Sequence, residues 1–471
     1  MNTDSEALHH ERELPHILVV LLIMIIAAAA LTWILPAGSY ARVFDESVGC
    51  EVIDPENFQA LERSPVGFFQ LFVSIEEGLV TTADISFMLF CVFSCLYLIE
   101  KTGAVDAVIA HLVRALNSHP KRAGLYITLM MIILAAWGST GTLSHEEIIP
   151  FIPLFIAVSI ALGYDAIVGI SISVIPVGVG FASATINPFT IGVAQSIAGL
   201  PLFSGLSYRI LVLAVMTCIT VIYVLCYASR VKKHPETSIL YDMDYSDFFI
   251  DKDKLATPIT LERRLILISL FGALVLMTWG LSHWVWYINE VAAVFVILAI
   301  LVGFLDHLTA NEIASSLVEG FGMGTLSAII VGVGKTVSII LEKGNNIDGI
   351  IHVCLRFTED LSLYLNGVLM LVFQTFLNLL IPSGSAQATV SMPLMTPIAD
   401  RIGMNRQIAV LIFQFGDGFS NLLWPTSFML VACIIAKIPP NKYYKWFLPL
   451  MGICFFAQCL FVFGAIAIGY H

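Results

Sequence analysis

The chain has 471 residues, of which 58% are hydrophobic and only 12% are charged, whereas a soluble globular domain carries about 25% charged residues. Because apolar stretches recur from end to end, this composition excludes an ordinary soluble protein and indicates a polytopic membrane protein. The net charge of −12 lies mostly in loops and argues against a nucleic acid partner. The nine cysteines include no C-x-x-C pair, so neither a zinc site nor a redox motif is predicted.

Charged loops give the expected orientation in the membrane. A first apolar span is expected at His16–Ala37. The acidic segment that follows, Gly38–Arg63, holds only two arginines and is expected outside, which places the N-terminus in the cytoplasm. A polar segment at residues 231–264 begins and ends with basic residues and is expected to be a cytoplasmic linker. It separates a first half, residues 1–230, from a second half, residues 265–471, which opens with an extra span.

Two interruptions mark the first half. Trp137–Ser144 separates two apolar arms that are each shorter than the about 20 residues needed to span a bilayer, which predicts a re-entrant hairpin over about residues 122–162. The next apolar stretch is interrupted at Ala182–Pro188 and predicts a broken helix over about residues 165–200.

The second half repeats this pattern. Ile381–Thr389 interrupts a second pair of short arms and predicts a hairpin over about residues 361–402. Gln414–Ser427 contains two glycines and a proline, and predicts a broken helix over about residues 405–438. In hydrocarbon the freed backbone groups need partners, so such breaks are expected to line a cavity, where they can hold an ion or a solute.

An internal repeat connects the two halves. Leu98–Ile109 matches Ile340–Ile351 at an offset of 342 − 100 = 242. The expected topology places the first copy inside and the second outside. The predicted fold is therefore an all-α polytopic membrane protein with two inverted-topology repeats, each with a re-entrant hairpin and a broken transmembrane helix.

The interruptions supply the candidate site residues. Hydroxyl and amide oxygens with freed carbonyls suit sodium, freed amides suit a carboxylate, and carboxylates at membrane depth are usually functional. The expected substrate-binding residues are Ser139, Thr140, Ser144, Glu146, Glu147, Asn187, Pro188, Ser383, Ser385, Asp417, Asn421 and Thr426. The expected ion-binding residues are Ser183, Thr185, Asn187, Ser420, Asn421 and Ser427, and no cofactor or metal beyond sodium is expected.

Simpler interpretations stay open for these residues. The Ser and Thr hydroxyls could bond back to their own helices. Glu146 and Glu147 could be solvated charges at the cytoplasmic mouth. Lys335 could neutralise one of them, attract a substrate carboxylate or form a structural ion pair.

Two enzyme motifs fail on inspection. His145–Glu147 lacks the second histidine of a zinc protease, because position 149 is Ile149. Gly332–Thr336 lacks the first glycine of a phosphate-binding loop, because position 329 is Ile329. The chain is therefore not expected to be an enzyme.

Three stretches, Asn187–Gln195, Ile381–Gln387 and Gln414–Asn421, resemble the YfcC-like branch of the anaerobic dicarboxylate carrier (DcuC) family, within the ion transporter superfamily. The resemblance covers nearly the whole chain. It implies a homodimer with a scaffold domain and an elevator-type transport domain in the bacterial inner membrane. It also implies that the hairpin tips and breaks form the substrate and ion sites, for dicarboxylates or basic amino acids.

The predicted function is secondary active transport of a small carboxylate-bearing metabolite, either an amino acid or a dicarboxylate, coupled to sodium or protons or working as an exchanger. Three carboxylates near the site (Glu146, Glu147 and Asp417) against Lys335 favour an amino acid, since a dianion would need its charge cancelled. An ion channel is the alternative class, and a membrane-embedded enzyme is a weaker one.

Overall fold

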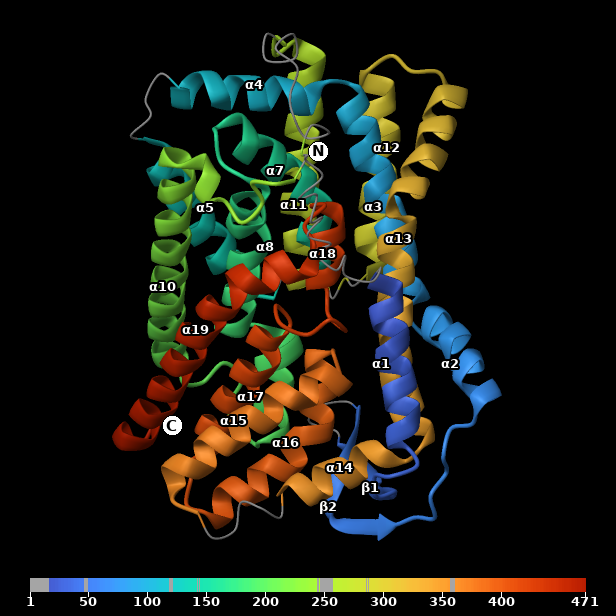
Figure 1. Cartoon of the computed structure of the whole chain (residues 1–471), viewed down its shortest axis with the longest axis vertical. Coiled ribbons are helices and arrows are strands. Elements are labelled where there is room, and N and C mark those ends of the chain that lie inside the picture. The colour runs from blue at the N-terminus through green and yellow to red at the C-terminus, as the bar shows by residue number, and fades with distance from the viewer. Residues whose placement is uncertain are drawn as a thin grey trace, which may run out of the picture.

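A computed structural model describes the chain. It covers residues 17–45, 50–117, 122–141, 143, 145–243, 245, 257–284, 286, 288–355 and 361–471. Among these residues, six helices are long and apolar enough to cross a membrane. They are α3 (Ala83–Lys101), α10 (Leu206–Lys233), α12 (Ile288–Leu305), α13 (Ala310–Lys343), α15 (Leu363–Leu380) and α19 (Pro440–Ile468). The chain is mostly helical, as predicted, and several helices, among them α1 (Ile17–Leu31), α3, α10 and α13, run along the long axis of the molecule (Figure 1).

The first half contains a helical hairpin followed by an interrupted helix. α5 ends at Gly138, and after a short tip the chain returns through α6, η1 and α7. Asp165 caps α8 by accepting a hydrogen bond from Val168 N, and Asn187 caps η2. The elements are α3 (Ala83–Lys101), α4 (Ala104–Asn117), α5 (Arg122–Gly138), α6 (His145–Ile148), η1 (Ile149–Phe151), α7 (Ile152–Ala161), α8 (Ala166–Ala182), η2 (Pro188–Gly192), α9 (Val193–Ile197), α10 (Leu206–Lys233) and η3 (Pro235–Thr237).

The second half follows the same order of helices after two further helices, α11 (Leu261–His283) and α12 (Ile288–Leu305). Asn405 caps α17 as Asp165 caps α8. The elements are α13 (Ala310–Lys343), α14 (Asn346–Leu355), α15 (Leu363–Leu380), α16 (Gly384–Arg401), α17 (Arg406–Ser420), α18 (Met429–Ile435) and α19 (Pro440–Ile468). In Figure 1, α4 lies across the upper end of the molecule and α14 across the lower end.

The longest helix, α13, is the centre of one packed group. It begins at a capping box in which Thr309 and Glu312 satisfy each other's backbone amides. It packs along α3, α1 (Ile17–Leu31) and α2 (Phe68–Thr81), and α12 packs against α3. The packing is close because glycines face the partner backbone: a Cβ at Gly78 would lie 2.5 Å from the carbonyl oxygen of Gly332.

A second packed group consists of the hairpins and the interrupted helices. α8 packs against α5, α7 and α17, and α17 packs against α15 and α16. In Figure 1 the first hairpin lies in the upper part and the second hairpin in the lower part of this group, with α8 and α17 between them.

The expectation of an all-helical chain is wrong between α1 and α2. Here β1 (Gly38–Asp45) and β2 (Cys50–Ala60) form an antiparallel hairpin. The hairpin is attached to α14, because Asp348 accepts hydrogen bonds from Tyr40 N at 3.0 Å and from Arg42 Nη2 at 3.1 Å. Phe58 stacks on His352 with the ring centroids 3.9 Å apart. These contacts come from far along the chain, so the local sequence did not predict the strands.

Candidate functional site

The two interrupted helices, α8 and α17, cross where both are about to break. A Cβ at Gly418 would overlap the backbone of Ala182, and a Cβ at Gly178 would lie 2.7 Å from a methyl carbon of Leu422. Only glycine allows this approach. The break after Ala182 and the break after Ser420 therefore lie side by side in the interior.

The tip of the first hairpin lies directly on the first break. Thr185 N donates to the carbonyl oxygen of Ser139 at 2.9 Å, and the hydroxyls of the two residues lie 3.0 Å apart. Gly141 has a φ of +76°, and a Cβ there would lie 2.5 Å from Cγ of Asn187. Asn187 in turn accepts hydrogen bonds from Phe189 N and Thr190 N at the start of η2. Serine, threonine and asparagine predicted from the sequence thus meet here.

The tip of the second hairpin reaches both breaks. A Cβ at Gly384 would lie 2.6 Å from Cγ2 of Thr190 in η2 and 2.8 Å from Oδ2 of Asp417 in α17. Asp417 has no exposed surface, and its Oδ1 accepts a hydrogen bond from Asn378 Nδ2 at 2.9 Å. Ser383 beside Gly384 is exposed, and Ser385 is half-buried.

Hydrogen bonds within the second break, and between the break and helices α15 and α19, hold it in place. Ser427 Oγ donates to Asn421 Oδ1 at 2.8 Å, and Thr426 Oγ1 donates to the carbonyl oxygen of Leu379 in α15 at 3.2 Å. The Tyr443 and Tyr444 hydroxyls of α19 donate to the carbonyl oxygens of Leu422 and Leu423 at 2.8 and 2.7 Å. Two freed backbone carbonyls of this break are therefore satisfied by tyrosine side chains.

Some predicted hydroxyls bond back to their own helices. Ser139 Oγ donates to Ala136 O, Thr140 Oγ1 to Trp137 O and Ser420 Oγ to Gly416 O, at 2.6–2.7 Å. In this conformation these three hydroxyls therefore bond back to their own helices, which is the simpler of the two interpretations that the sequence left open. Their carbonyl and amide groups remain part of the tips and breaks.

The remaining residues predicted from the sequence lie outside the contacts described above. Ser144 lies outside the described residues, as does the side chain of Glu146. Glu147 in α6 is half-buried, and Pro188 is exposed at the start of η2. Lys335 is half-buried in α13, one residue after Gly334, whose Cα faces the backbone of Thr426 in the second break.

Several buried polar atoms near the tips have no hydrogen-bond partner among the described residues. Native proteins leave few such atoms, so their concentration in one region distinguishes it from the rest of the interior. They are Ser183 Oγ, Asn187 Nδ2, Thr190 Oγ1, Asn378 Oδ1, Gln387 Oε1 and Asp417 Oδ2.

Four residues of this region were missed in the sequence. Thr190 lies in the short element η2 just after the first break and Asn378 in the regular helix α15, and only the fold brings them to the second hairpin tip and Asp417. His145 stacks on Phe428 and meets the edge of Phe181, between the two breaks. Arg209 is 2% exposed and donates to the carbonyl oxygen of Thr185 at 3.2 Å. A lone arginine in the apolar stretch of α10 was a readable signal, because intramembrane charges are rarely incidental.

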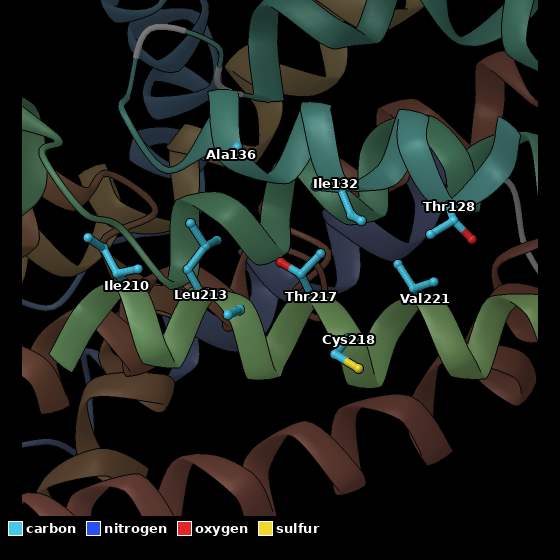
Figure 2. Close-up of a pocket in the computed structure, with 9 residues that line it drawn as sticks. Thr128, Ile132, Ala136, Ile210, Leu213, Thr217, Cys218 and Val221 are labelled. Atoms are coloured by element: carbon cyan, nitrogen blue, oxygen red, sulfur yellow. The ribbon is translucent and has the colours of Figure 1, made fainter. Parts of the chain in front are cut away.

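An apolar cavity of about 400 Å³ lies elsewhere, between α5 and α10 (Figure 2). Its walls include Thr128 and Ile132 from α5 and Ile210, Leu213 and Thr217 from α10. None of the candidate site residues lines it. At the candidate site itself the hairpin tips are packed onto the breaks, and the Asp417 carboxyl has no exposed surface.

The family model of the C4-dicarboxylate anaerobic carrier, DcuC, matches residues 14–467. The chain belongs to the DcuC family. This family consists of membrane transporters, and the DcuC-family relatives with assigned roles are transporters rather than enzymes.

Two relatives resemble this DcuC-family chain along nearly its whole length. The Escherichia coli protein named "Putative basic amino acid antiporter YfcC" is 31% identical over 500 residues, which cover 97% of each chain. An uncharacterized protein of Haemophilus influenzae is 27% identical over 499 residues, which cover 96% of each chain.

Solved structures give a more distant likeness to this DcuC-family chain. MtrF of Neisseria gonorrhoeae, described as one of a class of antimetabolite efflux pumps, has a TM-score of 0.43 and 15% identity, covering 96% of this chain and 95% of MtrF. The YdaH transporter of Alcanivorax borkumensis has a TM-score of 0.42 and 15% identity, covering 97% and 99% of the two chains.

Proposed function

We propose that the chain is a secondary active transporter that carries a small carboxylate-bearing metabolite by an elevator-type movement of its hairpins and broken helices. The observation that carries this proposal is that each hairpin tip packs on a helix break, that the two breaks lie side by side, and that the second tip also covers the buried carboxyl of Asp417. Broken helices that expose backbone groups to an enclosed site are the arrangement that secondary transporters use.

Paired hydrogen bonds support an inverted repeat within this proposal. Lys101 Nζ donates to Ser316 Oγ and Lys343 Nζ donates to Ser74 Oγ, both at 3.1 Å. The two lysines are 343 − 101 = 242 residues apart, and the two serines are 316 − 74 = 242 residues apart. Each half thus supplies the lysine of one bond and the serine of the other, as a two-fold relation between the halves requires.

Glycine contacts and turn residues follow the same relation. Gly78 packs on Thr336 and Gly320 packs on Ser94, again with both members shifted by 242 residues (320 − 78 and 336 − 94). Residues with positive φ also fall at matching turns of the two halves. They are Gly103 and Asn345, Gly163 and Gly403, and Gly199 and Lys437.

The division into two packed groups supports a scaffold and a transport domain. We assign α1, α2, α3, α12 and α13 to the scaffold, and the hairpins with the broken helices to the moving domain. We further propose a homodimer held by scaffold helices in the bacterial inner membrane, with the N-terminus in the cytoplasm; both follow from family analogy.

The charges near the tips favour an amino acid over a dicarboxylate. Asp417 is buried without a cationic partner among the described residues, and a second anion at about 4 Å would cost about 4 kcal/mol at an effective dielectric constant of about 20. A cationic amino or guanidinium group would pair with it instead. The E. coli relative's name agrees with this choice. Lys335, half-buried beside the second break, is the group that we assign to the substrate carboxylate.

The substrate-binding set that we propose is the sequence-predicted one, joined by Thr190, Asn378 and Lys335. The ion-binding set is Ser183, Thr185, Asn187, Ser420, Asn421 and Ser427, with sodium or protons as the coupling ion.

The test is uptake into proteoliposomes with a panel of amino acids and dicarboxylates, under sodium and proton gradients imposed separately. We expect saturable uptake and counterflow of an amino acid, and its loss in Asp417→Asn. Large single-channel currents would instead identify a channel. Succinate transport by a wild type that ignores every amino acid would overturn the choice of substrate.

A further inference from the structure

We propose that Asp417 carries a proton in this conformation, enclosed by the tip of the second hairpin, and that this proton is the ion which the transporter exchanges. The inference deepens the proposed function, on which its second part rests.

The two oxygens of the Asp417 carboxyl have different surroundings. Oδ1 accepts a hydrogen bond from Asn378 Nδ2 at 2.9 Å. Oδ2 has no partner among the described residues, although the side chain has no exposed surface. An ionised carboxylate with one free oxygen in an interior of low dielectric is strongly disfavoured, and neutralisation is the usual outcome.

Among the residues that the structure describes, no charged group contacts Asp417. Of the elements packed against α17, α8, η2 and α9 contain no ionisable side chain. α15 contains only Tyr364, near its far end, and α16 contains Asp400 and Arg401, also at its far end. α19 has Tyr443 and Tyr444, whose hydroxyls bond to the backbone of the second break. It also has Lys442 and Lys445 near its start and two cysteines. α17 itself has Arg406 at its first position. Among the described residues, only Asn378 interacts with the carboxyl.

The gap between Oδ2 and the tip of the second hairpin admits a proton but no ammonium or guanidinium group. The Gly384 backbone faces Oδ2 so closely that even a Cβ there would lie 2.8 Å from this oxygen and 2.6 Å from Cγ2 of Thr190. An ammonium or guanidinium group needs more room than a methyl group.

A proton on Oδ2 would also give a neighbouring orphan atom a role. A protonated carboxyl donates one hydrogen bond. Asn378, whose Nδ2 already donates to Oδ1 of this carboxyl, has an unpartnered Oδ1 that can accept it. The Asn378 side chain has no exposed surface.

The hairpin tip then controls when the proton leaves. With Gly384 in place, Oδ2 has no contact with water. When the tip moves away, the O–H bond breaks, the proton passes to water, and the carboxylate that forms can accept the cationic group of a substrate. Proton and cationic substrate therefore occupy Asp417 in turn, which is exchange of one for the other.

Infrared difference spectroscopy of the purified wild type against Asp417→Asn, without any substrate, tests the protonation directly. We expect the wild type to show the carbonyl stretch of a protonated carboxylic acid at neutral pH and the variant to lack it. Asn378→Leu keeps the carboxyl but removes its amide partner, and should shift this band. Asp165→Asn is the matched control on the first broken helix. Asp165 accepts hydrogen bonds from Val168 N, Tyr227 and Ser238, so its removal should leave the band unchanged. A wild type without the band, or a band that survives in Asp417→Asn, overturns the proposal.

The pH dependence of stability gives a second readout. If the folded chain holds a proton that the unfolded chain releases, stability falls as the pH rises. We expect the Tm of the wild type to fall by several degrees more than that of Asp417→Asn between mildly acidic and alkaline pH. Parallel Tm profiles contradict the inference. Both readouts are independent of substrate. If the infrared band is present but no uptake is found, only the transport proposal is rejected. If uptake is found but the band is absent, only the protonation of Asp417 is rejected.

Discussion

Arg209 in α10 donates a hydrogen bond from Nη2 to the carbonyl oxygen of Thr185, inside the first break, over 3.2 Å. Tyr443 in α19 does the same for the carbonyl oxygen of Leu422 in the second break, over 2.8 Å. The two acceptors are 422 − 185 = 237 residues apart, like the two break prolines (425 − 188 = 237). One break is therefore held by a buried cation and the other by a neutral hydroxyl.

This difference predicts unequal effects of removing the two donors. A hydrogen bond from a charged donor contributes about 1.5–3 kcal/mol and a neutral one about 0.5–1.5 kcal/mol. Arg209→Gln should therefore lower the Tm of the purified protein more than Tyr443→Phe. The Tm of Arg209→Lys should lie between that of Arg209→Gln and that of the wild type, because lysine keeps the charge but lacks the planar guanidinium group. Equal shifts in Arg209→Gln and Tyr443→Phe would show that the charge is not important at the first break.

The close crossing of α8 and α17 predicts that Gly418 cannot carry a side chain. Gly418→Ala would force the two helices apart and should cost about 1–3 kcal/mol, as overpacking usually does. Gly452→Ala in α19 is the control, because a Cβ there meets nothing within 4 Å. Alanine there should be neutral or stabilise by about 0.5–1 kcal/mol. Thermal unfolding and proteoliposome uptake measure both variants, and full uptake by Gly418→Ala would contradict the crossing.

Asp348 should hold the β-hairpin against α14. It is 5% exposed and accepts hydrogen bonds from Tyr40 N and Arg42. Asp348→Asn removes the charge and should cost about 1.5–3 kcal/mol, as for other hydrogen bonds to charged groups. Hydrogen–deuterium exchange should become faster in β1 and β2 while α17 stays protected. Unchanged exchange in the strands would mean that Phe58 and His352 suffice to hold them.

The segment after α10 should respond to acid through Asp242. The hydrogen bond from Lys442 lowers the pKa of Asp242 below its usual value. Because the pKa is lower in the folded chain, this contact stabilises above the unfolded pKa of about 4 and is lost as the pH falls below it. The group is exposed, so the effect is local. Hydrogen–deuterium exchange at residues 238–243 should be faster in Asp242→Asn than in the wild type at neutral pH. The two proteins should converge at acid pH; a difference that persists there would exclude this ion pair as the cause.

The sequence by itself determined the membrane class and the places where the apolar stretches are interrupted, and it singled out Asp417 as a carboxylate within such a stretch. Each of these follows from local physics: apolar composition, proline and glycine inside apolar stretches, and the cost of a carboxylate at membrane depth. The tertiary structure alone decided that Thr190, Asn378 and Gly384 surround that carboxyl, that Arg209 reaches the first break, and that the hydroxyls of Ser139, Thr140 and Ser420 turn back on their own helices. It also decided the strands at Gly38–Ala60, which are fixed by Asp348, some 300 residues away. These relationships depend on how closely helices pack, for example where Gly418 lies against the backbone of Ala182. Such packing is set by contacts between segments that are distant in the sequence, and no local pattern encodes it.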